Sequence, residues 1–232
     1  MSLRRLALVT DAWHPQTNGV VHTLSRLAAH LSAQGTDVEV ISAGAEHRTF
    51  SMPTYPEIRL TCEPWKAIAA LKRFQPDAVH IATEGPLGIW VNAWLRRRRL
   101  RFTTSFHTRF PEYLRARFPL VPLGFGYAIE RWFHAAAERT LVGTQSMIAE
   151  LRNKRVGRNL VHWPRGVDAE RFHPRHRHHG VYPLPRPIFA YVGRVAMEKT
   201  LEENKGSKPP TNKRHDKPQS VSQLSEKSYE KM

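Results

Sequence analysis

Two loops in the sequence carry residue types that can contribute to a ligand-binding site. TDAWHPQTNGVV places Asp11, Asn18 and Gly19 before a helix-like segment, and SFHTRF places His107 after an apolar strand-like run. A glycine at a helix start lets backbone amides approach a ligand closely, and the helix dipole favours an anion there. An imidazole at a strand end can reach a binding site. Asn-Gly before a helix is more often a plain turn and cap than a ligand site, and a lone histidine in this position is structural about as often as it is functional.

Several other kinds of site are disfavoured. GFGY at Gly124–Tyr127 follows no strand and lacks the third glycine of a dinucleotide fingerprint, which argues against a nicotinamide-dependent oxidoreductase. No Asp-x-Asp pair is present to clamp a diphosphate through a metal. The single cysteine, Cys62, excludes a disulfide framework and suits a reducing compartment. Four histidines without fixed spacing favour an exposed linker over a metal site: His173, His176, His178 and His179.

Strand-like and helix-like segments alternate along most of the chain. Short apolar runs predict strands at 5–10, 37–43, 57–61, 77–83, 101–107, 140–144 and 159–164, and helical spacing predicts helices at 19–35, 65–74, 86–99, 123–139 and 145–155. This alternation predicts an α/β fold with a Rossmann-like, doubly wound parallel sheet. Ligands of such folds bind at the carboxyl ends of the strands. We therefore expect Asp11, Glu84 and His107 to share one edge of the sheet.

The chain changes character after residue 172. A polar, proline-rich stretch at 173–186 reads as a linker, and residues 187–199, PIFAYVGRVAMEK, read as a strand with a charged turn. Arginine outnumbers lysine 25 to 4 through Lys199, whereas residues 200–232 hold 1 arginine and 6 lysines and few apolar side chains. We expect this last segment to be disordered. It reads either as a natural tail or as the product of a frameshift, fusion or misassembly.

The formal net charge of +16 indicates an anionic partner. Nucleic acid is disfavoured because no recognition motif accompanies the charge. Phe125, Ile129, Trp132, Phe133 and Ala136 fall on one helical face, which suits either the protein core or, with nearby arginines, contact with an anionic membrane. No stretch approaches the roughly 20 apolar residues of a membrane span. We expect a cytoplasmic protein, either soluble or peripheral on the inner face of the membrane.

Five motifs together resemble one enzyme family. LVTDAWHPQTNGVVHTLSRLAAHL, SFHTRFPEYLRARFP, AERTLVGTQSM, RGVDAERFHP and YVGRVAMEK occur in one order between residues 5 and 199. The set resembles the retaining GT-B glycosyltransferases of family 4, above all the branch with phosphatidylinositol mannosyltransferases and glycolipid-forming glycosyltransferases. The resemblance implies an N-terminal acceptor domain at 1–172 and a donor domain beginning at 187. RGVD departs from the commoner Asn-Gly-Val-Asp, which leaves Arg165 without an assigned role.

The resemblance also implies a reaction and its residues. A hexose would pass from a GDP- or UDP-linked donor to a lipid-linked or polyol acceptor, without a metal cofactor. His107 would contact the donor sugar, and Gly19, Arg194 and Lys199 would bind the donor phosphates. Asp11, Asn18 and Glu84 would lie on the acceptor side or in the cleft. The family's later donor-domain motif has no counterpart after Thr200. We therefore expect this chain to be inactive by itself; the alternative is a non-catalytic module that binds an acceptor or anionic lipid.

Overall fold

The computed structural model describes residues 3–44, 47–52 and 55–177. All of them belong to Met1–Tyr182, the first of the two units into which the chain divides. The expected strand and turn at 187–199, with Arg194 and Lys199, and the expected tail at 200–232 lie outside the described residues. So does most of the expected linker at 173–186, in which one short 3-10 helix, Pro174–His176, is described.

The described residues form a six-stranded sheet whose strands all run parallel, in the order β2-β1-β5-β6-β7-β8. Its strands are β1 (Arg5–Thr10), β2 (Asp37–Ser42), β5 (Ala78–Ile81), β6 (Thr103–Phe106), β7 (Arg139–Val142) and β8 (Leu160–His162). The chain winds outward from β1 in both directions, to β2 on one side and to β5, β6, β7 and β8 on the other, so the sheet is doubly wound. The expected α/β, Rossmann-like fold is confirmed.

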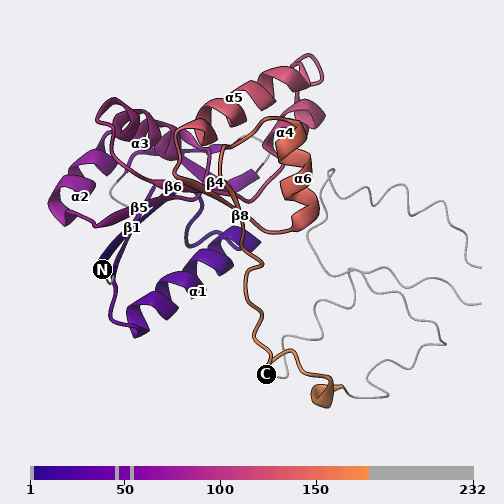
Figure 1. Ribbon diagram of the computed structural model, residues 1–232. Coiled ribbons are helices and arrows are strands. Elements are labelled where there is room, and N and C mark those ends of the chain that lie inside the picture. The colour runs from indigo at the N-terminus through magenta and orange to yellow at the C-terminus, as the bar shows by residue number, and fades with distance from the viewer. Residues whose placement is uncertain (1–2, 45–46, 53–54, 178–232) are drawn as a thin grey trace, which may run out of the picture. The chain divides into compact units, whose positions relative to one another are not determined.

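Helices cover both faces of this sheet (Figure 1). They are α1 (Gly19–Ala33), α2 (Lys66–Phe74), α3 (Pro86–Arg97), α4 (Phe110–Arg117), α5 (Leu123–Ala135) and α6 (Gln145–Asn153). In Figure 1, α1 lies below the sheet, and α2, α3 and α5 lie above it. None of the helices within the described ranges is long and apolar enough to cross a membrane.

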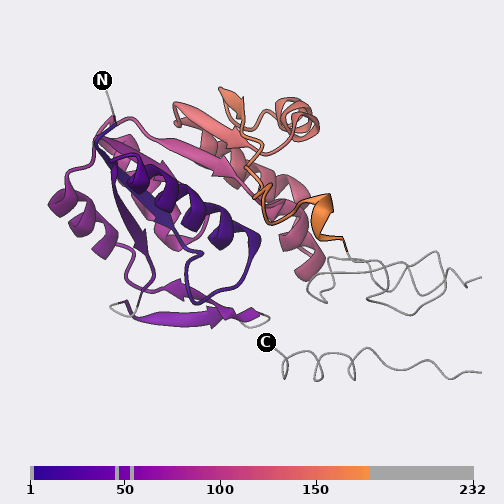
Figure 2. The same cartoon turned by 90° about the horizontal axis from the view of Figure 1, so that it is seen from below.

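The strand expected at 57–61 belongs to a different sheet. It is the end of β4 (Tyr55–Thr61), which pairs antiparallel with β3 (Thr49–Met52) in a separate two-stranded sheet. Figure 2 shows this hairpin lying across one end of the strands of the main sheet. Sequence reasoning missed β3 because TFSM is short and has too few apolar residues for a strand signal.

The buried side of α5 does not coincide with its apolar face. Phe125 and Trp132, two residues of that face, are exposed, whereas Phe133 is fully buried. The buried residues of α5 are Gly126, Tyr127, Glu130, Phe133 and His134. The helix is therefore rotated so that two ionisable side chains face the sheet and two large apolar ones face solvent. Apolar periodicity cannot predict this rotation, because partners from other segments hold His134, and through it Glu130, in the interior.

Candidate functional site

The carboxyl ends of β1, β5, β6 and β7 bring the expected site residues to one edge of the sheet. Asp11 follows β1, Glu84 follows β5, and His107 follows β6. Gly143 follows β7, and because Phe106 pairs with Val142, His107 and Gly143 continue two adjacent strands side by side. We call this edge the rim, defined by Asp11, residues 82–85, His107 and Gly143.

Asp11 fastens the first rim loop to the start of α3. Its carboxylate accepts hydrogen bonds from the backbone amides of Leu87, at 3.0 Å, and Gly88, at 3.2 Å, and from the Thr83 hydroxyl at 3.1 Å. Burial raises the pKa of Asp11 to about 6, although these donors act in the opposite direction. A Cβ on Gly85 would lie 2.3 Å from the carboxylate carbon, so only glycine fits there. Asp11 thus caps a helix at the rim.

Asn18 and Gly19 form the start of α1. The Asn18 side-chain oxygen accepts from the amides of Val20 and Val21, both at 3.0 Å, which is an N-cap. Gly19 is different, because a Cβ there would meet nothing within 4 Å. The protein itself does not require a glycine at this position. The open space leaves room for a ligand near the positive end of the helix dipole.

His107 is a rim residue whose whole imidazole has unused hydrogen-bonding capacity. Both of its ring nitrogens are buried and have no hydrogen-bond partner among the described residues. Its ring makes an edge contact with Trp163, with centroids 6.0 Å apart. Burial, followed by the charges of Arg165 and His80, lowers the pKa of His107 to about 3. At neutral pH the imidazole is therefore uncharged and offers one donor and one acceptor to a ligand.

Glu84 points toward the interior and joins a buried cluster with Glu130 and His134. Nε2 of His134 lies 3.1 Å from Oε2 of Glu130 and 3.6 Å from Oε1 of Glu84. The other ring nitrogen, Nδ1, lies 2.8 Å from the Thr104 hydroxyl. Burial would lower the pKa of His134, but the two carboxylates outweigh it and raise that pKa to about 9. Burial raises the pKa of Glu130 as well.

This cluster is the part of the site region that sequence reasoning missed. Its oxygen and nitrogen atoms lie within 4.8 Å of one another, a spacing that could hold a metal ion. The 3.1 Å contact between Glu130 and His134 already pairs two of the three groups through a hydrogen bond. The sequence does show a glutamate and a histidine four residues apart within an apolar helix. That spacing alone does not predict a buried cluster, which depends on the tertiary contact with Glu84.

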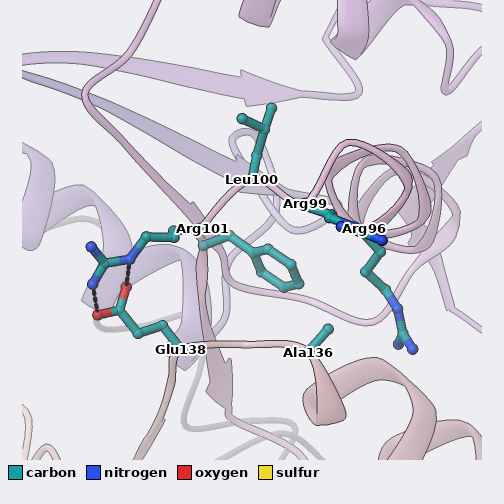
Figure 3. Close-up of a pocket in the computed structure, with 7 residues that line it drawn as sticks. Arg96, Arg99, Leu100, Arg101, Ala136 and Glu138 are labelled. Carbon is teal, nitrogen blue, oxygen red and sulfur yellow. Dashed lines mark hydrogen bonds and ion pairs between the residues drawn. The ribbon is translucent and has the colours of Figure 1, made fainter.

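The described residues also form a cavity of about 370 Å³ at the opposite edge of the sheet. Figure 3 shows Arg101 pointing to Glu138, with Arg96 on the other side of the opening. Arg101 and Glu138 form a two-pronged ion pair. Because Arg101 precedes β6 and Glu138 precedes β7, this cavity lies at the amino ends of the strands, away from the rim.

Comparison with known proteins gives both sequence and structural matches. The family model "Glycosyltransferase Family 4" matches residues 17–171. A GDP-mannose-dependent alpha-mannosyltransferase of Corynebacterium glutamicum is 29% identical over 222 residues, which cover 85% of this chain and 53% of that protein. The enzyme of the same name from Mycobacterium tuberculosis is 28% identical over 87% of this chain and 59% of its own length.

The solved structure of a sucrose-phosphate synthase from Thermosynechococcus elongatus has a TM-score of 0.55 and 16% sequence identity, over 74% of this chain and 50% of that one. At this identity the likeness bears on the fold alone. The chain spans about half the length of the curated relatives that it matches.

Proposed function

Because the chain belongs to glycosyltransferase family 4, we propose that it takes part in the transfer of a hexose from a nucleotide diphosphate sugar to a lipid-linked or polyol acceptor, with retention of configuration. The names of its mannosyltransferase relatives favour a GDP-linked donor over a UDP-linked one. The described domain would form the acceptor side of the cleft. In this proposal the reacting groups meet at the rim.

The observation that carries this proposal is the state of His107. A buried, uncharged imidazole that has no hydrogen-bond partner in the described part of the chain is costly unless a ligand satisfies it. A hexose presents hydroxyl groups that can both donate to and accept from such a ring. We assign to His107 a hydrogen bond to the donor sugar at the moment of transfer. Such a bond helps catalysis only to the extent that it is stronger in the transition state than in the ground state.

The donor diphosphate would be bound by cations and backbone amides rather than by a metal. Gly19 at the start of α1 has open space beside it, which suits a close approach of a phosphate oxygen. Arg194 and Lys199 lie outside the described residues, and we retain them as proposed diphosphate ligands because fixed cations stabilise a leaving diphosphate. Transfer by a protein that contains both domains should therefore survive a chelator, and complete loss of turnover on chelation would contradict this part.

We propose that the protein meets its acceptor at the surface of an anionic membrane. Phe118, Leu120 and Phe125 are exposed at the α4–α5 corner, and Leu120 is 98% exposed. Arg115 is exposed on α4 nearby in the sequence. Apolar side chains beside a cation suit the interface of a bilayer that contains acidic lipid. The cytoplasmic face is the side we propose.

We further propose that the 232-residue chain has no turnover by itself. The matched part of the Corynebacterium glutamicum relative is 53% of its length, and bringing donor and acceptor together in a closed cleft supplies up to about 7–11 kcal/mol of an enzyme's acceleration. The competing function, a module that binds acceptor or anionic lipid without catalysis, predicts lipid binding alone. Incubation with GDP-mannose and mixed lipids, followed by measurement of GDP release, separates the two proposals when the same assay is run on a chain carrying both domains.

A further inference from the structure

Arg165 is a cation at the rim for which the described residues provide no anion. The residue is half-buried, and its side chain makes no hydrogen bond or ion pair within the described ranges. Two carboxylates, one three residues further along the same segment and one on α6, are already engaged. Asp168 binds Arg26 at 2.9 Å and the amide of Arg171 at 3.0 Å, and Glu150 pairs with Arg109 at 2.5 Å. A partly desolvated guanidinium without a partner favours an anionic ligand.

The guanidinium of Arg165 lies against the end of β7. A Cβ on Gly143 would be 2.8 Å from its Nη2 and 3.3 Å from its Nε. The Arg165 side chain therefore occupies space that is open because residue 143 is a glycine. Because His107 and Gly143 continue neighbouring strands, the guanidinium lies close to the imidazole, and its charge is one of the causes that keep His107 uncharged. Two groups able to donate hydrogen bonds thus converge at one point of the rim.

The backbone of Arg165 and the start of α6 also favour an anionic ligand at this point of the rim. Arg165 has φ of +50°, a left-handed conformation that is unfavourable for a non-glycine residue. Strain of this kind is retained where surrounding structure or function requires it. Directly after Gly143, Thr144 caps α6, whose first turn contains no acidic residue. The positive end of the α6 dipole therefore adds to the charge of Arg165.

We propose that Arg165 and His107 form an oxyanion site at the carboxyl ends of β6 and β7 that binds a phosphate group of a substrate. This inference rests on the proposed transferase function and extends it. The phosphate could come from the donor diphosphate or from a phosphorylated acceptor, since both present the same oxyanion to a guanidinium. His107 contributes its ring N–H, and Arg165 contributes the charge.

The test is a calorimetric titration of the 232-residue chain with inorganic pyrophosphate, as a probe of the donor phosphates, and with glycerol phosphate, as a probe of an acceptor phosphate. Side-chain NMR signals of His107 are recorded in parallel. We expect one of these probes to bind and to shift the His107 signals. R165A should weaken that binding at least tenfold and abolish the shift, whereas R165K should weaken it less. R158A, which removes an exposed arginine at the amino ends of the strands, is the matched control and should bind like the unchanged chain.

Each outcome decides one question. If the binding of pyrophosphate depends on Arg165, the phosphate group comes from the donor. If the binding of glycerol phosphate depends on it, the phosphate group comes from the acceptor. Equal weakening by R165A and R158A would mean general attraction to a basic protein and would overturn the site, as would failure of the unchanged chain to bind either probe. If R165A is unfolded, the affinity of R165K for the probes and the probe-induced shift of the His107 signals still test the site. Binding that depends on Arg165, together with a two-domain protein that transfers no hexose, would refute the proposed function and leave this inference standing.

Discussion

At the scale of single residues, His107 ties stability to pH. Its pKa falls from the ordinary 6.5 to about 3 on folding, so between these values the unfolded chain binds a proton that the folded chain does not. Stability should therefore fall as pH decreases from 6.5 toward 3. His80, with a pKa of about 4, acts in the same direction. H107Q should make the decline less steep, measured by urea unfolding between pH 6.5 and 4.5. H22Q, at an exposed histidine of α1, is the control, and an unchanged slope for H107Q would contradict the assignment.

Asp11 gives a second residue-scale prediction, about structure rather than substrate. D11A removes the acceptor of the Leu87 and Gly88 amides and leaves both donors buried without a partner. We expect a loss of about 1–3 kcal/mol in the free energy of unfolding. D37A is the matched control, because Asp37 makes only a 3.6 Å surface pair with Arg5, and such pairs contribute little. Equal effects of D11A and D37A in denaturant titrations would show that the cap does not stabilise the rim.

At the scale of elements, the approach of α3 to the β5 end depends on Gly88. A Cβ there would lie 2.0 Å from the backbone oxygen of Thr83, so α3 would have to move. We expect Gly88→Ala to destabilise the domain by about 1–3 kcal/mol. Gly124→Ala in α5 is the contrasting variant, since its Cβ would meet nothing within 4 Å. That change should be neutral or stabilising by up to about 1 kcal/mol. Thermal unfolding of both variants checks the prediction, and the same sign for both would refute it.

The Glu84–Glu130–His134 cluster joins α5 to the β5 loop and predicts the opposite pH dependence. Because the pKa of His134 rises from 6.5 to about 9 on folding, its contribution is complete below pH 6.5 and is lost as pH rises toward 9. E130Q removes a carboxylate that raises this pKa and should flatten the decline. Urea unfolding at pH 6.5, 7.5 and 8.5 measures this decline in stability for the unchanged chain and for E130Q. Stability that stays constant over this range in the unchanged chain would exclude a protonated His134.

The elements also show how far the sequence could predict the fold and the site. Continuous apolar runs such as LALVT predicted the central strands, because strands buried on both faces need them. Asp11 and His107 were placed at the correct edge because each directly follows such a run. The burial of Glu130 and His134 was beyond reach, since it depends on Glu84 and Thr104 from distant segments. The pairing of β3 with β4 and the position of Arg165 beside Gly143 likewise depend on tertiary contacts.

At the scale of the whole molecule, the charge of +16 and the exposed apolar corner predict binding to lipid. The 232-residue chain should sediment with vesicles containing acidic lipid at low salt and dissociate as salt screens the charge. L120S should weaken this binding more than L100S, which changes an exposed leucine at the opposite edge of the sheet. Equal effects of the two substitutions would place the contact elsewhere than the α4–α5 corner.

The central claim is that the rim around His107 is where a sugar nucleotide binds. The most direct measurement is an NMR titration of the 232-residue chain with GDP-mannose, following the His107 ring and the Gly19 amide. We predict saturable shifts at both positions that are larger than those caused by UDP-glucose. Shifts confined to the Arg96–Glu138 cavity, or none at the rim at saturating GDP-mannose, would contradict the claim.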